Sequence, residues 1–112
     1  DVVNIKPSRI GGIRDAIAMH DVLVDRGIDA WVGGMLESGI GRASCLALAA
    51  MPGFTLTPDL SASARYFASD VTRAFVLEDG MLQVPTGLGI GVEPLPEVLA
   101  RKDVEIETLF QR

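Results

Sequence analysis

The sequence predicts an α/β domain in which short parallel strands alternate with helices. Residues 2–57 alternate between short apolar runs and longer amphipathic stretches, and a glycine or a proline lies at or near the end of each. In addition, 48% of the 112 residues are hydrophobic, which is enough for a well-buried core. Strands that alternate with helices at such short spacing run parallel and are joined by right-handed crossovers. A chain of this length forms one domain at most.

The first strand and the first helix are predicted at residues 2–6 and 12–26. The strand contains β-branched residues and ends before Pro7, which cannot donate to a sheet ladder. In the helix, apolar positions recur at spacings of three and four residues, and Gly27 ends the pattern. The positions expected to face the core are Ile13, Ile17, His20 and Val24. We expect His20 to be packed there rather than to act as a base.

A second strand is predicted at residues 28–36, a second helix at residues 41–51 and a third strand at residues 54–57. The second helix is nearly all apolar and stops at a Pro-Gly pair. Its single cysteine, Cys45, is expected to be a small buried hydrophobic residue. Trp31 in the second strand is expected to pack in the interior.

The pattern changes beyond residue 59, so we divide the chain into strand-helix units at residues 1–63 and a tail at residues 64–112. In the tail, apolar runs at residues 74–77 and 81–84 flank an Asp-Gly pair that is typical of hairpin turns. A short helix and a closing strand are expected within residues 94–107. Alternating glycines at positions 87, 89 and 91 resemble a dinucleotide-binding loop, but prolines follow where that loop requires a helix.

Composition and charge exclude several classes of function. The net charge is −5, and no stretch gathers lysine or arginine into a patch, so we expect no nucleic acid partner. No apolar run reaches the ~18 residues that a membrane span needs, so we expect no membrane partner. A single cysteine cannot form an intrachain disulfide, which favours a cytoplasmic protein. The chain opens inside an apparent strand without a methionine, which suggests a piece of a longer protein.

Lys6 is the first candidate for chemistry, because ligands of parallel α/β folds gather beyond the carboxyl ends of the strands. A lysine that ends an apolar strand must point into a cavity or find an anionic partner. Near a metal or another cation its neutral form is favoured, and a neutral lysine can abstract a proton next to a carboxylate. Arg9 is a candidate for that neighbouring cation. The alternatives are a surface lysine and an arginine that forms an ordinary salt bridge.

The second candidate region follows the second and third strands. Gly33 and Gly34 would let the backbone approach a ligand closely, and the amides at the start of the next helix attract carboxylate oxygens. A lone carboxylate is a poor site for a hard cation, so Glu37 is interpreted as a turn or cap residue. Asp59 is placed to reach a substrate, with helix capping by Asp59 or Ser61 as the equal alternative.

Two long motifs carry a resemblance to a known family. They are Asp-Val-Val-Asn-Ile-Lys-Pro-Ser-Arg-Ile-Gly-Gly at residues 1–12 and Gly-Gly-Met-Leu-Glu-Ser-Gly-Ile-Gly-Arg at residues 33–42. The chain resembles the N-acylamino acid racemase and o-succinylbenzoate synthase group of the enolase superfamily, within the muconate-lactonizing subgroup. The resemblance implies that residues 1–63 are strands six to eight of a TIM-type (β/α) barrel. The tail at residues 64–112 would then pack on a capping domain that lies outside this chain.

The resemblance also implies an active site. Lys6 corresponds to a sixth-strand acid/base lysine that works opposite a second lysine across the substrate α-carbon, and Arg9 would support it. Residues Gly33, Gly34, Met35 and Asp59 would bind the substrate. The second lysine and the carboxylates that bind Mg²⁺ would precede Asp1, so no metal ligand is expected in this chain.

The expected activity is metal-dependent removal of the proton α to a carboxylate. The parent enzyme would be an o-succinylbenzoate synthase of menaquinone biosynthesis, an N-acylamino acid racemase, or both, acting on a small carboxylate and forming a homo-oligomer. The 112-residue chain alone is expected to be inactive. Another cycloisomerase of the same subgroup, and a free-standing binding module without chemistry, are the alternatives.

Overall fold

The computed structural model describes residues 1–101 and 103–110. A two-stranded sheet, two long helices and three short helical turns account for the regular structure of this part of the chain. In chain order the elements are β1 (Val2–Ile5), η1 (Pro7–Arg9), α1 (Ile13–Asp25), β2 (Asp29–Val32), α2 (Gly39–Ala49), η2 (Ser63–Arg65) and α3 (Pro96–Leu99).

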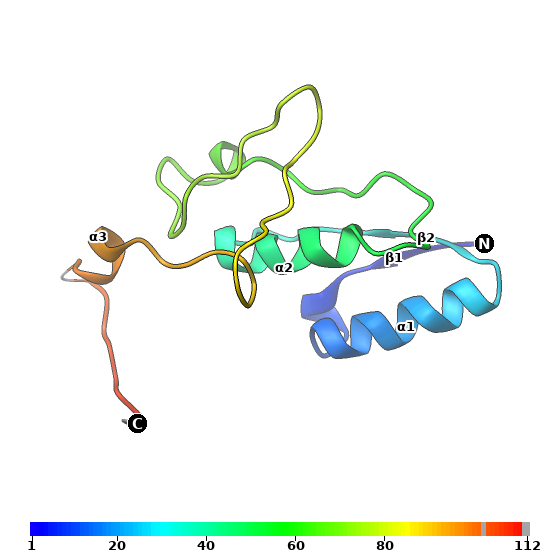
Figure 1. The fold of residues 1–112 in the computed structure, drawn as a ribbon, viewed down its shortest axis with the longest axis horizontal. Coiled ribbons are helices and arrows are strands. Elements are labelled where there is room, and N and C mark those ends of the chain that lie inside the picture. Colours follow the sequence, from blue (N-terminus) through cyan, green and yellow to red (C-terminus); the bar gives the residue numbers. More distant parts are fainter. Residues whose placement is uncertain (102, 111–112) are drawn as a thin grey trace.

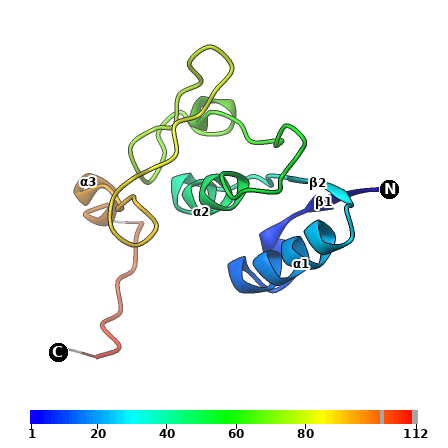
Figure 2. The same cartoon turned by 45° about the vertical axis from the view of Figure 1, so that its right-hand side comes forward.

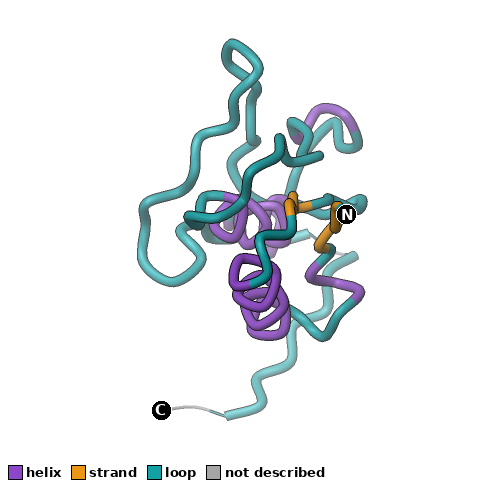
Figure 3. The backbone as a smooth tube through the Cα atoms, turned by 90° about the vertical axis from the view of Figure 1, so that its right-hand side faces the viewer, coloured by secondary structure: helices purple, strands orange, loops and turns teal. Residues whose placement is uncertain are grey.

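The strands β1 and β2 are parallel, as the sequence predicts, and their register pairs Val2 with Asp29 and Ile5 with Val32. Helix α1 makes the crossover between them (Figure 1). The two long helices lie side by side on one side of the strands (Figure 3). The core between strands and helices consists of Ile5, Ala16, Leu23, Ala30, Val32, Cys45 and Leu48. Because side chains alternate along a strand, Asn4 and Lys6 lie on the sheet face opposite Ile5.

Helix α1 turns only part of the predicted stripe inward: His20 is buried and Ile17 packs against the core, but Ile13 and Val24 do not. Its buried residues are Ala16, His20 and Leu23, whereas Ile13 and Val24 are 43% and 46% exposed. The small Ala16 side chain lets the helix approach the strands closely, and centring the contact on it moves Ile13 and Val24 to the flanks. The prediction of a packed His20 is confirmed: its ring nitrogens lie 3.0 Å from Asp21 Oδ1 and from the carbonyl oxygen of Pro52.

The predicted third strand at residues 54–57 is wrong. The segment runs beside β2, but its one bridge pairs Asp59 with Gly33, and one further backbone bond, from the Leu56 amide to the Ala30 carbonyl, joins it to β2. Pro58 has no N–H to donate, which interrupts the ladder. Strand β2 is also shorter than predicted, because the chain leaves the sheet after the Gly33 bridge and turns into α2.

Residues 60–95 return over α2 as an irregular segment rather than as a ladder of strands (Figures 1 and 2). This segment packs a second small core onto α2, formed by Ala43, Leu46 and Phe75. The predicted turn at residues 79–80 is present, since both residues have positive φ and Glu78 pairs with Met81. The flanking strands are wrong, because the pairing stops at that single bridge.

Helix α3 satisfies the short helix predicted near the end of the chain, but the closing strand is not formed by the described residues up to 110. None of the helices formed by residues 1–101 and 103–110 has the length and apolar character that crossing a lipid bilayer requires.

Candidate functional site

Lys6 lies at the carboxyl edge of the sheet, directly after β1. Its Nζ donates a hydrogen bond of 2.9 Å to the carbonyl oxygen of Gly34 and lies 3.8 Å from the sulfur of Met35. Gly34 follows the end of β2, so the parallel pairing of the two strands is what brings Lys6 and Gly34 together. Lys6 is half-buried, and Met35 is 37% exposed. The ammonium group therefore lies at the surface of the strand ends, held by a backbone carbonyl.

The two glycines of this turn are required by close packing. A Cβ atom at residue 33 would overlap the side-chain oxygen of Asn4, and one at residue 34 would lie 2.9 Å from the carbonyl oxygen of Asp59. The Gly33 amide continues the sheet by donating 2.9 Å to the carbonyl of Ile5, and the Gly34 amide donates 2.8 Å to Asp59. The glycines thus let three backbone segments converge beside Lys6.

Glu37 closes the turn, as its interpretation as a turn residue predicts. Its carboxylate accepts a hydrogen bond of 2.6 Å from the Met35 amide. The Cys45 thiol points at the same carboxylate, with 3.9 Å between Sγ and Oε1. Burial, together with the neighbouring Glu37 charge, raises the pKa of Cys45 to about 11. Cys45 is therefore a buried, protonated thiol, as expected from its apolar neighbours.

Asp59 and Arg9 contact the site with their backbone amides and not with their side chains. The Asp59 amide donates 3.0 Å to the carbonyl of Val32, and the Arg9 amide donates 2.9 Å to the carbonyl of Lys6. Both side chains are exposed. In the described part of the chain neither of these side chains takes part in a hydrogen bond or an ion pair, and neither Asp59 nor Ser61 caps η2. The structure therefore brings Lys6, Gly34, Met35 and the Asp59 backbone together.

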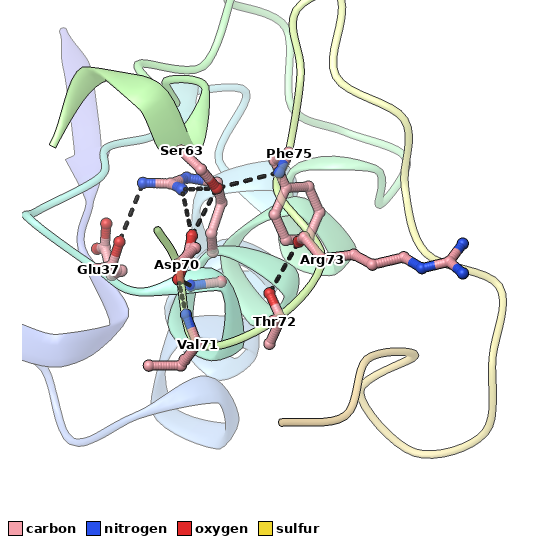
Figure 4. A network of polar contacts seen from close by, with 9 residues as sticks. Glu37, Ser63, Asp70, Val71, Thr72, Arg73 and Phe75 are labelled. Carbon is pink, nitrogen blue, oxygen red and sulfur yellow. Dashed lines mark hydrogen bonds and ion pairs between the residues drawn. The ribbon is translucent and has the colours of Figure 1, made fainter. Parts of the chain in front are cut away.

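A buried polar network lies on the other side of the turn, and the sequence analysis missed it. The Arg42 guanidinium donates 3.1 Å to Ser63 Oγ and 3.0 Å to the carbonyl of Glu37, and lies 3.6 Å from Asp70 Oδ2. Ser63 Oγ donates 2.5 Å to Asp70 and accepts 3.0 Å from the Phe75 amide. Figure 4 shows Glu37, Ser63, Asp70 and Phe75 converging on this point.

Asp70 also occupies the start of α2. Its Oδ1 accepts hydrogen bonds of 2.8 Å from the amides of Gly39 and Val71. Burial alone would raise the pKa of Asp70, but these amides, the Ser63 hydroxyl and the Arg42 charge together hold it below its usual range. The carboxylate that the amide at the start of this helix attracts is therefore one of the chain's own.

Comparison with known proteins identifies the family. The family model described as enolase C-terminal domain-like matches residues 1–98. The chain belongs to the enolase C-terminal domain-like family. It is 54% identical over 98 residues to an N-succinylamino acid racemase from Amycolatopsis, covering 88% of this chain and 27% of that protein.

Two further matches extend over most of this enolase-type chain. An o-succinylbenzoate synthase from Bacillus subtilis is 38% identical over 98% of this chain and 30% of its own length. The crystal structure of an enolase-superfamily member from Listeria innocua superposes with a TM-score of 0.82 at 44% identity, over 88% of this chain and 27% of that one. The chain thus spans less than a third of these relatives, and its fold is the α/β fold of the enolase C-terminal domain.

The described residues of this enolase-family chain do not fit a divalent metal. Among residues 1–101 and 103–110, no group of three or more His, Cys, Asp or Glu side chains is arranged to hold one. At the strand ends the Lys6 ammonium lies 2.9 Å from the Gly34 carbonyl oxygen, and the Glu37 carboxylate near Gly34 provides too few oxygen ligands for a hard cation. The strand-end site therefore contains one group that can exchange a proton, the Lys6 amine, and it is surrounded by backbone groups.

Proposed function

We propose that the protein containing this chain removes the proton α to a carboxylate of a small molecule, as an o-succinylbenzoate synthase, an N-acylamino acid racemase, or both. The observation that carries this proposal is the position of Lys6. Its amine lies beyond the carboxyl ends of two parallel strands, where α/β enzymes place their reacting groups, and is oriented by the Gly34 carbonyl. The names of the relatives from Amycolatopsis and Bacillus subtilis support both activities.

In this proposal Lys6 carries the proton. As the neutral amine it takes the α-proton of the bound substrate, and as the ammonium ion it returns a proton to the same carbon. The Gly34 carbonyl accepts from Nζ and so fixes the direction of the remaining lone pair or N–H. In racemisation the second lysine, outside this chain, would work on the opposite face of the carbon.

The remaining predicted site residues shape the substrate pocket. Gly33, Gly34 and Met35 would line the side that receives the acyl or succinyl group, since they form the turn over Lys6. Asp59 would contact the substrate from the adjoining segment, where its exposed side chain follows the Gly33 bridge. Arg9 would act through Lys6, with which it shares the turn after β1.

We propose that β1, β2 and the segment ending at Asp59 are strands six, seven and eight of a (β/α) barrel, so that residues 1–63 complete the barrel. The tail at residues 64–112 would then pack on a capping domain. Large exposed apolar side chains in the tail support this packing, since Leu88 is fully exposed and Phe110 is 81% exposed. A homo-oligomeric, cytoplasmic enzyme is the expected context.

The proposed activity includes Mg²⁺, as expected for this family. Because the residues described here do not form a site for it, we place its ligands elsewhere in the protein. The contribution of this chain is therefore confined to proton transfer and substrate contacts.

Replacing Lys6 by alanine in the full-length protein tests the proposal. We expect turnover in both the synthase and the racemase assay to fall about a hundred- to ten-thousandfold, the range for loss of a general acid or base. Arg14→Ala, which removes an exposed cation from α1, is the control and should keep full activity. Full activity of Lys6→Ala in both assays would overturn the assignment of Lys6.

A further inference from the structure

We infer that Arg42 is a positioning residue for Lys6, acting through the turn that carries Gly34. The inference rests on the proposed role of Lys6 as the acid/base group. Arg42 does not touch Lys6, and it is 1% exposed. A short path of hydrogen bonds nevertheless connects the two side chains.

The first part of the path fixes the acceptor of the Lys6 hydrogen bond. The Gly34 carbonyl, which accepts from Nζ, belongs to the same planar peptide unit as the Met35 amide. The Glu37 carboxylate ties this turn together by accepting from the Met35 amide. Where the Gly34 carbonyl points therefore depends on where Glu37 is held.

The second part of the path holds Glu37. One arm of the Arg42 guanidinium, Nη2, donates 3.0 Å to the backbone carbonyl of Glu37. Arg42 lies in the first turn of α2, and its own amide bonds to the carbonyl of Ser38, so the anchor belongs to a regular helix. The turn is thereby attached to a rigid element of the core.

The third part keeps the guanidinium itself in place. Its other arm, Nη1, donates to Ser63 and lies 3.6 Å from the Asp70 carboxylate. Asp70 is fixed in turn by two backbone amides. A buried guanidinium is stable only when its charge and its donors are satisfied, so this arrangement has little freedom to move.

The two arms of Arg42 allow its effect on stability to be tested separately from its effect on the position of Lys6. Only Nη2 lies between the network and Lys6, whereas the Ser63 bond lies on the far side. Ser63→Ala breaks the network without touching the arm that holds Glu37. A purely structural arginine would give the same result for loss of either arm, and a positioning arginine would not.

The experiment measures the reactivity of Lys6 directly in the full-length protein. Wild type, Arg42→Lys and Ser63→Ala are treated briefly with acetic anhydride at a series of pH values, and acetylation of Lys6 is followed by mass spectrometry. Arg42→Lys keeps the charge but cannot reach both partners. Turnover and the midpoint of thermal unfolding are measured on the same samples.

For Arg42→Lys we expect Lys6 to be acetylated faster, because a loosened Gly34 carbonyl no longer holds Nζ in its hydrogen bond. At pH 8 the rate should rise about three- to tenfold, the range that one hydrogen bond gives. Turnover should fall roughly tenfold or more, since misplacing a reacting group by about 1 Å can cost about a hundredfold. Ser63→Ala should unfold at a lower temperature with the wild-type acetylation profile.

A wild-type acetylation profile in Arg42→Lys would overturn the inference, and so would an equal shift in Ser63→Ala. If Arg42→Lys does not fold, Glu37→Ala serves instead, because it removes the carboxylate through which Arg42 is argued to act on the Met35 amide, and a wild-type profile there overturns the inference too. A shifted profile combined with full activity of Lys6→Ala would uphold the positioning and refute the proposed function. An unshifted profile combined with an inactive Lys6→Ala would refute the positioning role of Arg42 and support the proposed function.

Discussion

The turn at residues 33–37 separates two polar regions of opposite character. On one side Lys6 is half-buried, meets a single carbonyl and a thioether, and faces the open edge of the sheet. On the other side Arg42, Ser63 and Asp70 are buried and hydrogen-bonded to one another and to backbone groups. In the described residues no buried side-chain nitrogen or oxygen lacks a partner.

Charged side chains therefore have different roles in the two regions. A satisfied buried network contributes rigidity, and removal of any member leaves the others without a partner. A sparsely bonded amine at a strand end contributes little to stability but keeps its proton available for exchange. We therefore expect substitutions in the buried network to lower mainly stability, and substitution of Lys6 to lower mainly activity.

The largest expected effect on stability is at Arg42. In the full-length protein, Arg42→Ala should lower the free energy of unfolding by about 3–5 kcal/mol, because Asp70 becomes an unpaired buried charge. Lys6→Ala should change it by less than about 1 kcal/mol, since water can replace the lost donor at Gly34. Denaturant titrations of both variants compare them. Equal losses would remove the distinction between the two regions.

A smaller effect is expected at the crowded glycine of the strand-end site. Gly33→Ala should destabilise the protein by about 1 kcal/mol, because the new methyl group overlaps the end of the exposed Asn4 side chain, which must move aside. Asn4→Ala empties that space, so the double variant should recover most of the loss. Thermal unfolding of the two single variants and the double variant measures this coupling. Losses that simply add would show that the contact with Asn4 is not the cause.

The buried network should also give the protein an acid-sensitive contribution to stability. The pKa of Asp70 lies below its ordinary value of 3.8 in the folded state, so its contribution is complete above about pH 4 and is lost as pH falls through the folded pKa. Asp70→Asn should be less stable at pH 7 and should show a flatter decline of the unfolding midpoint from pH 5 to pH 2. A decline parallel to wild type would refute this role for Asp70.

The smallest expected effect concerns the Cys45 thiol, which adjoins both regions through Glu37. Its pKa of about 11 lies above the ordinary 9.0, so the unfolded state loses this proton first as pH rises. Stability should therefore fall between about pH 9 and pH 11 in wild type, and less steeply in Cys45→Ala. The folded protein should also resist alkylation by iodoacetamide at pH 8. Rapid alkylation without denaturant would contradict the assigned burial.

The sequence predicts the strand-end region well because the information is local. The run that ends at Lys6, the paired glycines at residues 33–34 and the helix stop at residues 52–53 each act through a few neighbouring residues. The position of Lys6 relative to Gly34 then follows from the parallel alternation of strands and helices. The roles assigned to Lys6, Arg9 and Asp59 remain predictions.

The buried network could not be predicted because its members are far apart in the sequence. Arg42 meets a serine 21 residues later, and the Gly39 amide meets an aspartate 31 residues later. Nothing in the local pattern around residue 70 distinguishes a buried carboxylate from a surface one. The predictions of the inward stripe of α1 and of the third strand failed in part for a related reason. Packing and neighbouring backbone groups decide both features, rather than the periodicity of the sequence.

The most direct test of the account is deuterium exchange at the α-carbon by full-length Lys6→Ala. An N-succinylamino acid is incubated in D₂O as each pure enantiomer, and loss of the α-proton signal is followed by NMR. If Lys6 acts on one face of the carbon and the second lysine on the other, the variant should exchange the α-proton of one enantiomer and not of the other. Exchange of both enantiomers at wild-type rates would contradict the account.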